Sequence, residues 1–169
     1  MMDLTPITTL PEHEQEALRA LNNEHARETS HLHRPAWKAL CDAAFCAVTT
    51  PGRDVLLIAL TEDADYDSPN FQWFRMRYPL FVYVDRIIVS PNARGRGLAA
   101  GLYEHLFATA AAAGRERVVC EVNSDPPNPA SDAFHARLRF EVVGTATLSG
   151  RGKTVRYMER IVEPCGGAH

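Results

Sequence analysis

The segment Arg94-Gly95-Arg96-Gly97-Leu98-Ala99-Ala100 is the most informative part of this sequence for predicting its fold. It follows a β-rich run, residues 81–89, and leads directly into an apolar helical pattern. Glycines allow a sharp turn in which backbone N–H groups point inward, and the start of a helix adds the positive end of its dipole. With two arginines beside them, these residues predict a phosphate-binding loop whose expected ligand is a pyrophosphate.

The segments on either side of this loop predict a strand, a helix and a second strand. Apolar residues recur every three or four positions from Leu98 to Ala113, and Gly114 ends the pattern. The run 117–122 then has the composition of another strand. A strand–helix–strand unit of about forty residues is expected to place its two strands in parallel, with a right-handed crossover.

The remaining segments complete a mixed α/β pattern around this unit. The run 62–70 contains four acidic residues and a Ser-Pro pair, and it is predicted to be a long loop, either a solvated turn or a loop that gates a substrate. The last strand is expected at an exposed edge that a homodimer would use. We expect strands at 4–10, 44–49, 54–61, 140–148 and 154–162, and helices from 12 to before Pro35, at 36–43 and from Pro129 to near 139.

Composition and charge limit the class of protein. The chain has 169 residues, 46% of them hydrophobic, which fits one domain over residues 1–169. A net charge of -3 at pH 7 argues against nucleic acid as the main partner. Because the first ten residues lack the features of a signal peptide and no apolar run is long enough for a membrane span, we expect a cytoplasmic protein with no membrane partner. The four cysteines, at 41, 46, 120 and 165, lack metal-ligand spacing, so free thiols and no metal site are predicted.

The glycines also fit a second interpretation. Gly95, Gly97 and Gly101 match a GxGxxxG dinucleotide pattern, and Glu121 stands where a ribose-binding acid is wanted. A nicotinamide domain needs further parallel strands, however, and the residues after Glu121 are predicted to form one helix and a hairpin. Two arginines beside the turn also suit a ligand with more phosphate charge than a dinucleotide carries there. An NAD(P)-dependent oxidoreductase is therefore ranked third among the candidate functions.

Read as Arg94-x-x-Gly97-x-Ala99, the loop resembles the coenzyme A signature Gln/Arg-x-x-Gly-x-Gly/Ala of the GNAT-type N-acetyltransferase superfamily. The segment 134–144 stands where that family has a Tyr-x-x-x-Gly-Phe-like sequence before a closing strand. The family resemblance implies an α/β (α+β) fold whose central mixed, mostly antiparallel sheet is splayed at one parallel strand pair and flanked by about four helices. The chain looks closest to a poorly characterised bacterial branch, whose marks are Asn22-Asn23 and the segments 65–70, 83–86, 120–123 and 126–129.

The resemblance implies an N-acetyltransferase that moves an acetyl group from acetyl-CoA to a primary amine of a small molecule or peptide. Asn128 matches a family asparagine that often touches the pantetheine arm, although a helix N-cap alone explains it. The residues that the family pattern assigns to coenzyme A are Ile88, Val89, Arg94, Gly95, Arg96, Gly97, Leu98, Ala99, Asn128 and His135.

Acetyl transfer to an amine needs a neutral nucleophile, a polarised thioester carbonyl and a proton for the leaving thiolate. Tyr83 and Asp85 face the same way on an extended strand, and we expect Asp85 to bind the ammonium group and take its proton. The alternatives are that Asp85 pairs with Arg86 and that Tyr83 fills the core. The residues expected to contact the acceptor are Asn23, Asp65, Asp67, Asn70, Glu121 and Asn123.

Two positions depart from the family's pattern. Arg139 replaces the glycine that usually precedes the final phenylalanine, which leaves the local turn in question. His135 stands where many members have the tyrosine that protonates the thiolate; it is either the general acid here or a surface imidazole. This second departure keeps a non-catalytic coenzyme A-binding sensor as the alternative function.

Overall fold

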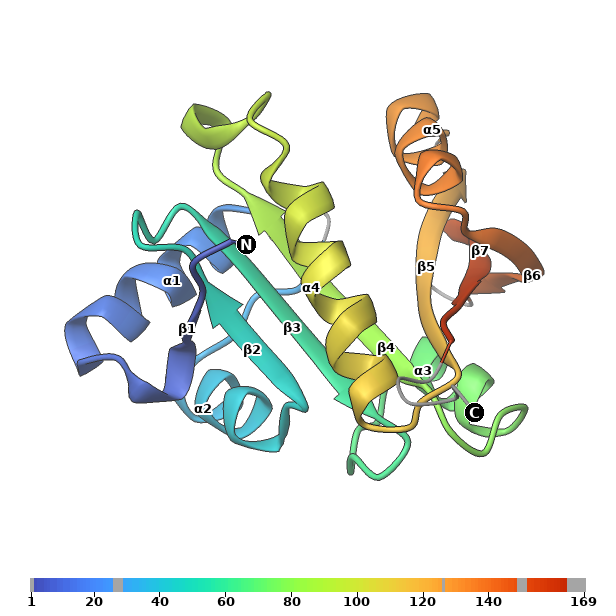
Figure 1. Ribbon diagram of the computed structural model, residues 1–169, viewed down its shortest axis with the longest axis horizontal. Coiled ribbons are helices and arrows are strands. Elements are labelled where there is room, and N and C mark those ends of the chain that lie inside the picture. Colours follow the sequence, from blue (N-terminus) through green and yellow to red (C-terminus); the bar gives the residue numbers. More distant parts are fainter. Residues whose placement is uncertain (1, 26–28, 126, 149–151, 164–169) are drawn as a thin grey trace, which may run out of the picture. The chain divides into compact units, whose positions relative to one another are not determined.

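The computed structural model describes residues 2–25, 29–125, 127–148 and 152–163. Within these residues, seven strands form one sheet in the order β1-β2-β3-β4-β5-β7-β6, and the chain also forms five α-helices (Figure 1). The strands are β1 Thr5–Pro6, β2 Cys46–Thr49, β3 Val55–Thr61, β4 Val82–Val89, β5 Arg117–Asp125, β6 Glu141–Leu148 and β7 Lys153–Ile161. The α-helices are α1 Glu12–Glu24, α2 Arg34–Ala43, α3 Pro69–Arg75, α4 Leu98–Ala112 and α5 Pro129–Arg137, and the 3-10 helices are η1 Ile7–Thr9 and η2 Pro91–Ala93.

The pairing of the strands confirms the predicted fold class. β4 and β5 are parallel and pair through Val82↔Val118 and Tyr83↔Val119. The pairs β1–β2, β2–β3, β5–β7 and β6–β7 are antiparallel. The sheet is therefore mixed and mostly antiparallel, as expected, whereas the expected first strand is reduced to two residues followed by η1.

Helix α3 lies partly in the run that the sequence assigned to a loop. Ser68 is its N-cap, since the side chain of Ser68 accepts a hydrogen bond from the N–H of Phe71 at 3.4 Å, and Pro69 occupies the first helical position. The helix buries Asn70, Phe71 and Phe74. With seven residues, it is too short for a helical period to be recognised among so many aromatic side chains.

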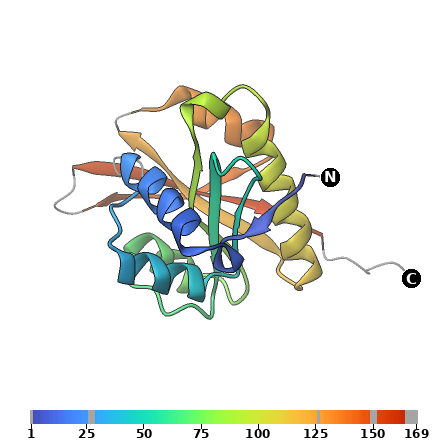
Figure 2. The same ribbon diagram turned by 90° about the vertical axis from the view of Figure 1, so that its left-hand side faces the viewer.

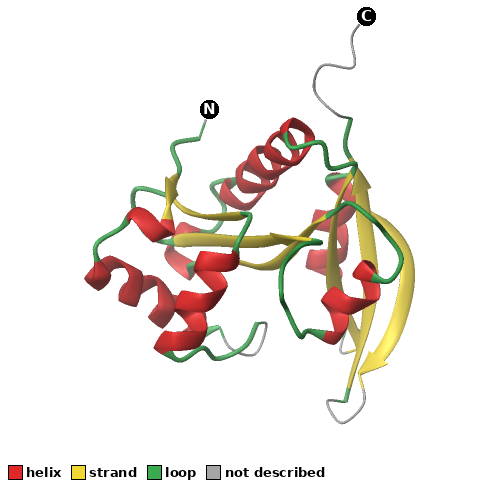
Figure 3. Cartoon of the chain, turned by 90° about the horizontal axis from the view of Figure 1, so that it is seen from below, coloured by secondary structure: helices red, strands yellow, loops and turns green. Residues whose placement is uncertain are grey.

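The chain packs as two compact units. Unit 1 comprises Met1–Asp65 and Val84–Leu106, and unit 2 comprises Tyr66–Tyr83 and Phe107–His169. In unit 1 the side chains of β3 from Val55 to Leu60 are completely buried. Helices lie on both sides of β2 and β3: in Figure 3, α1 and α2 are on one side of these strands and α4 is on the other. Figure 2 shows the side of the molecule on which α1 and α2 are nearest the viewer. This explains why β3 is a continuous apolar run without alternation.

In unit 2, β7 lies between β5 and β6. It pairs with β5 from Arg117↔Ile161 to Asp125↔Thr154 and with β6 from Glu141↔Glu159 to Leu148↔Lys153. The expectation that the last strand forms the exposed edge is therefore wrong, because both of its sides are paired and the sheet ends at β6. Residues 149–151 of the predicted β6–β7 turn lie outside the described residues.

The cysteines in the described residues, Cys41, Cys46 and Cys120, are buried and free, as predicted. Burial raises the pKa of Cys41 to about 12 and that of Cys46 to about 11, so both thiols stay protonated and unreactive near neutral pH. Cys165 lies outside the described residues. Among the helices of the described segments, none has the length and apolar character needed to span a bilayer.

Helix α5 ends in a turn that places Arg139 in the left-handed region, at φ 65°. The N–H of Phe140 donates to the carbonyl of His135 at 3.0 Å, and the N–H of Arg139 donates to that of Ala136 at 3.0 Å. These two bonds define a Schellman motif. The rings of His135 and Phe140, whose centroids are 5.3 Å apart, supply the side-chain contact that often accompanies this motif. The turn that usually needs glycine is therefore present, with an arginine at its left-handed position.

Replacing Arg139 with glycine is expected to stabilise the protein. A non-glycine residue in the left-handed region costs about 1–2 kcal/mol, and glycine removes this cost. Glycine also has more freedom in the unfolded chain, which offsets part of the stabilisation, so the expected increase in unfolding free energy is about 0.5–1 kcal/mol. Urea denaturation measures it. Arg139→Ala is the control, because it removes the side chain but keeps the strain; equal stability of the alanine and glycine variants would contradict the explanation.

Candidate active site

The glycine loop, residues 94–97, connects η2 to α4 in unit 1. Its two glycines have left-handed backbones, at φ 81° for Gly95 and φ 72° for Gly97. The segment before it is fixed by backbone bonds: the N–H of Ser90 donates to the carbonyl of Asp54 at 2.8 Å, and the N–H of Ala93 donates to that of Ser90 at 2.9 Å. The loop itself is exposed. The sequence thus predicted both the place of the turn and its need for glycine.

The first turn of α4 has the properties of an anion site. Its first backbone bond runs from the N–H of Gly101 to the carbonyl of Gly97 at 3.0 Å, so the N–H groups of residues 98–100 have no acceptor inside the helix. A Cβ atom added at either Gly95 or Gly97 would meet nothing within 4 Å, which leaves open space over the loop. Arg94 and Arg96 are exposed beside it. Loop, helix dipole and arginines together fit a pyrophosphate.

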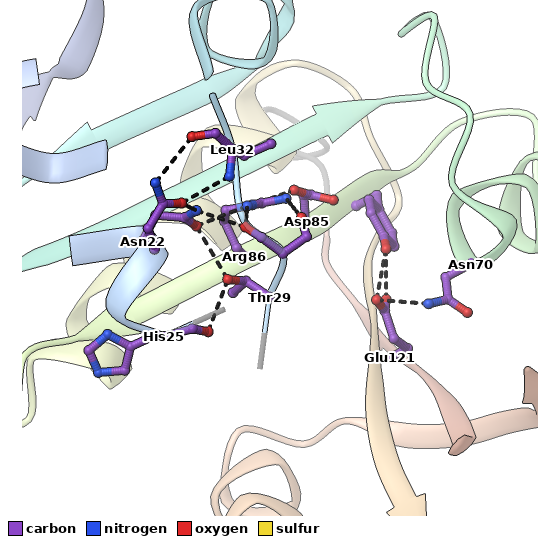
Figure 4. Close-up of polar contacts among 11 residues, drawn as sticks. Asn22, His25, Thr29, Leu32, Asn70, Asp85, Arg86 and Glu121 are labelled. Carbon is purple, nitrogen blue, oxygen red and sulfur yellow. Dashed lines mark hydrogen bonds and ion pairs between the residues drawn. The ribbon is translucent and has the colours of Figure 1, made fainter. Parts of the chain in front are cut away.

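A second cluster in unit 1 surrounds Arg86, on β4 next to Asp85. Both side chains are almost fully buried, and the Nε of Arg86 donates to the Oδ2 of Asp85 at 2.7 Å (Figure 4). The Nη1 of Arg86 also donates to the Oδ1 of Asn22 at 2.9 Å, and its Nη2 to the hydroxyl of Ser30 at 3.2 Å. The structure thus contains the Asp85–Arg86 pair that the sequence left as an alternative to catalysis.

Asn23 lies beside this cluster and binds backbone. Its Nδ2 donates to the carbonyl of Leu32 at 3.1 Å, and its Oδ1 accepts from the N–H of Leu32 at 2.9 Å. Oδ1 accepts in addition from the amide of Asn22 at 3.0 Å. The contacts of Asn23 therefore anchor the chain between α1 and α2, and a contact with the acceptor remains a prediction.

Asp85→Asn is expected to destabilise the protein. The asparagine keeps an oxygen for the Nε of Arg86, but the charge of the guanidinium loses its buried counter-charge, and a hydrogen bond to a charged group contributes about 1.5–3 kcal/mol. We expect a loss of about 2 kcal/mol in unfolding free energy, measured by urea denaturation. Asp3→Asn, at an exposed position in the same unit, is the control. An unchanged stability of Asp85→Asn would show that the ion pair contributes nothing.

The polar cluster of unit 2 joins four elements around Glu121, on β5. The hydroxyl of Tyr83, on β4, donates to the two carboxylate oxygens at 2.8 and 3.0 Å. The Nδ2 of Asn70, on α3, donates to Oε1 at 3.1 Å, as Figure 4 shows. The hydroxyl of Tyr157, on β7, donates to the Oδ1 of Asn70 at 2.8 Å. Three residues that the sequence singled out separately, 70, 83 and 121, are thus hydrogen-bonded together.

Tyr157 is the member of this cluster that the sequence analysis missed. Its ring stacks on Trp73 at 4.2 Å between centroids and 22° between planes. Burial and the charge of Glu121 raise the pKa of Tyr157, so its hydroxyl remains a donor. The only signal in the sequence is its place in an alternating strand, and that is the pattern of an ordinary core residue.

His135 is buried on α5, which contradicts the surface-imidazole alternative. Its Nδ1 lies 2.7 Å from the carbonyl of Ser131, so Nδ1 carries the proton and donates. Burial lowers the pKa of His135, opposed by the bond to Ser131 and by the charge of Asp132. The neutral ring is therefore favoured at neutral pH. Asn128 is the N-cap of α5, as predicted: its Oδ1 accepts from the N–H of Ser131 at 3.2 Å.

The lowered pKa of His135 makes stability depend on pH. Because the unfolded state binds a proton at a higher pH than the folded state, the contribution is present above the ordinary histidine pKa of about 6.5 and is lost as the pH falls through the lower, folded-state value. We expect His135→Gln to lose less stability than the wild type between pH 7 and pH 5, measured by urea denaturation at each pH. Parallel curves for the two proteins would contradict this.

The other predicted acceptor residues are not brought into this cluster. Asp65 and Asp67 are exposed in the segment before α3, and Asn123 is half-buried on β5, two positions after Glu121. The side chains of Ile88 and Val89, at the end of β4, are buried and half-buried. In the described ranges, no group of three or more histidine, cysteine or acidic side chains is arranged to hold a metal ion.

Part of the chain matches a known protein family. A model of the Acetyltransferase (GNAT) family matches residues 62–140, a range that contains α3, the glycine loop, α4, β5 and α5. A comparison with curated protein sequences finds no match.

Solved structures share the fold at low sequence identity. The ribosomal-protein-S18-alanine N-acetyltransferase of Escherichia coli matches at 15% identity and a TM-score of 0.66, over 100% of this chain and 99% of that one. NAA60 of Arabidopsis thaliana, solved with acetyl-CoA, matches at 12% and 0.70, over 96% and 100%. A phosphinothricin acetyltransferase of Sinorhizobium meliloti, also solved with acetyl-CoA, matches at 16% and 0.67, over 99% and 95%. Residues 62–140 thus match the GNAT acetyltransferase family, and the chain shares its fold with solved N-acetyltransferases.

Proposed function

We propose that the protein transfers the acetyl group of acetyl-CoA to a primary amine of a small molecule or peptide. The observation that carries the proposal is the glycine loop, whose two left-handed glycines leave open space before the first turn of α4. An N-acetyltransferase needs a site for the pyrophosphate of its co-substrate, and this loop has the shape and charge for one. Two structural relatives were solved with acetyl-CoA, which supports the same co-substrate here.

In this proposal the backbone N–H groups of residues 96–99 bind the pyrophosphate, and the side chain of Arg94 adds charge. The strand end at Ile88 and Val89 and the residues Asn128 and His135 are further candidates for contacts with the coenzyme. Arg96 has a hydrogen bond to the carbonyl of Asn92 at 3.3 Å, a weak and exposed contact that leaves its guanidinium able to turn toward a phosphate. Binding is therefore expected to depend mainly on backbone shape.

We propose Glu121 as the group that accepts the proton of the acceptor's ammonium. Its carboxylate is half-buried and is hydrogen-bonded by neutral donors, Tyr83 and Asn70. Asp85 was the first candidate from the sequence, but its side chain is bound to Arg86 and would have to break a buried ion pair to take a proton. Contrasting surroundings thus favour Glu121 as the base and Asp85 as a structural residue.

The ammonium group of the acceptor loses two protons during the proposed reaction. Glu121 takes one proton from the ammonium group, and the neutral amine attacks the thioester carbonyl to form the new C–N bond. The C–S bond breaks, the nitrogen loses a second proton, and the thiolate of coenzyme A takes up one proton. Glu121 releases its proton to solvent. Tyr83 would orient the carboxylate of Glu121 through its hydroxyl, and the acidic residues 65 and 67 would favour a cationic acceptor.

His135 is a poor general acid in this arrangement. To donate a proton from Nε2 it must first be charged, and burial disfavours the charged form. Its contacts with Ser131 and Phe140 instead tie together the two ends of α5. We therefore propose that His135 supports the helix and that the proton on the departing thiolate comes from the amine or from water.

Release of free thiol from acetyl-CoA tests the function. The assay uses a panel of primary amines: amino acids, polyamines, aminoglycosides and short peptides with a free N-terminus. Turnover with any of them supports the proposal. Saturable coenzyme A binding with no turnover on the whole panel favours a non-catalytic sensor. The oxidoreductase alternative is not favoured, because most strand pairs with a described register are antiparallel, whereas a dinucleotide-binding domain needs several parallel strands.

A further inference from the structure

We propose that Asn70 is a positioning residue for acetyl transfer: it bridges the hydroxyl of Tyr157 and the carboxylate of Glu121, and it thereby fixes the orientation of Glu121 and favours its ionised form. The inference rests on the proposed role of Glu121 as the base. It assigns a function to a side chain on α3 and to one on β7, 87 residues apart in the sequence.

The contacts of Asn70 allow one orientation of its amide. An ionised carboxylate only accepts hydrogen bonds, so the NH₂ group must face Glu121, at 3.1 Å. The Oδ1 then faces the hydroxyl of Tyr157, which donates to it at 2.8 Å. Asn70 is only 9% exposed, so water competes little for either bond. Both ends of the side chain are therefore matched to particular partners.

Tyr157 is itself held in place. Its ring stacks on Trp73, and Phe74 contacts the same ring edge-on at 5.2 Å between centroids. Trp73 in turn lies directly over Gly144, the residue opposite Tyr157 on β6, where an added Cβ would overlap the indole ring. The hydroxyl of Tyr157 consequently has little freedom to leave Asn70. The packing of the aromatic rings thus restricts Asn70 and, through it, the carboxylate of Glu121.

The bridge acts on the charge of Glu121 as well as on its orientation. Asn70 on α3 and Tyr83 on β4 both donate hydrogen bonds to Glu121, and these bonds stabilise its carboxylate form. Titratable groups near Glu121 include Tyr83 on β4, Tyr157 on β7 and the buried thiol of Cys120 beside it on β5. Arg77, after α3, acts on Tyr157. Tyr157 and Cys120 both have raised pKa values and stay neutral in the range where a carboxylate titrates.

Asn70→Asp tests the inference, because it keeps the shape of the side chain and replaces the donor by a second carboxylate. Two carboxylates at hydrogen-bond distance cannot both ionise easily, so the pair is expected to take up a proton at a pH about one unit or more above the wild-type midpoint. The readout is the ¹³C shift of the Glu121 carboxyl group against pH, assigned with Glu121→Gln. The acidic limb of the pH profile of kcat/KM is expected to move by the same amount.

The two measurements separate the inference from the proposed function. If the NMR midpoint does not move in folded Asn70→Asp, the bridge does not act on Glu121 and the inference is overturned. If the midpoint moves but the kinetic limb stays in place, Glu121 is not the base, and both the inference and the proposed role of Glu121 are overturned. Movement of both together supports the inference.

Tyr157→Phe provides a second test without any change of charge. It removes the hydroxyl that orients Asn70 but keeps the ring on Trp73. We expect kcat to fall about five- to tenfold while the KM for acetyl-CoA stays unchanged. Tyr78→Phe is the matched control, since Tyr78 is hydrogen-bonded to a different carboxylate, Glu159, and is expected to keep full activity. Equal activity of the two phenylalanine variants would overturn the inference.

Discussion

Glu121→Gln is expected to lower turnover by about 10³ while the affinity for acetyl-CoA stays near its wild-type value. The amide keeps the size of the side chain but cannot take a proton from the acceptor, and general base catalysis contributes about 10²–10⁴ in rate. Since the loop proposed to bind the pyrophosphate is made by other residues, coenzyme binding is expected to stay unaffected. Thiol release under saturating acetyl-CoA measures turnover, and isothermal titration measures affinity.

The control for this prediction is Glu141→Gln. Glu141 is another glutamate of unit 2, exposed at the start of β6, and its neutralisation is expected to leave turnover unchanged. Raising the pH increases the fraction of neutral amine, so Glu121→Gln is expected to recover part of its activity under alkaline conditions. Full activity of Glu121→Gln at neutral pH would remove Glu121 from the mechanism and return Asp85 to first place among the candidates.

The parts of the fold that depend on local sequence were predictable. The glycine loop is one example, because a left-handed turn between a strand and a helix requires glycine at defined positions. The N-cap at Asn128 is another, since an Asn-Pro pair before a helix has one common meaning. In both cases the physical cause lies within a few residues of its effect.

The parts that depend on pairing between distant segments were less predictable. Their positions in a predicted strand or loop made Tyr83, Asn70 and Glu121 separate candidates. Their common cluster depends on the register of β4 on β5 and on helix α3, part of which was predicted to be a loop. Tyr157 belongs to this cluster only because β7 lies between β5 and β6 in the sheet. No local pattern distinguishes that arrangement from a last strand at the edge of the sheet.

Asp85 illustrates a different limit. Neighbouring residues on a strand point to opposite faces, so an ion pair between Asp85 and Arg86 was only an alternative. The arginine side chain is long enough for its Nε to reach back to Asp85 while its Nη groups bind Asn22 and Ser30. Which partner a buried arginine selects depends on all the acceptors around it, and those come from residues more than fifty positions away.

Replacing Gly97 with valine is expected to abolish the stabilisation of the protein by acetyl-CoA. A ligand bound only by the folded state at a hundred times its Kd adds about 2.7 kcal/mol, which for a chain of this size raises the melting temperature by about 5–10 °C. The space that a Cβ would enter at Gly97 is open, so the valine side chain would occupy the volume assigned to the phosphates. Differential scanning fluorimetry with and without acetyl-CoA measures the shift.

Gly114→Val is the matched control for this experiment. Gly114 follows the other end of α4 and has φ 75°, against φ 72° at Gly97, and an added Cβ would also meet nothing within 4 Å there. Both variants therefore carry the same backbone strain from a β-branched residue at positive φ and are expected to melt at similarly reduced temperatures without ligand. Only Gly97→Val is expected to lose the response to acetyl-CoA. If folded Gly97→Val keeps the wild-type shift, the glycine loop does not bind the coenzyme; if both variants lose it, the loss reflects strain in α4 and not the phosphate site.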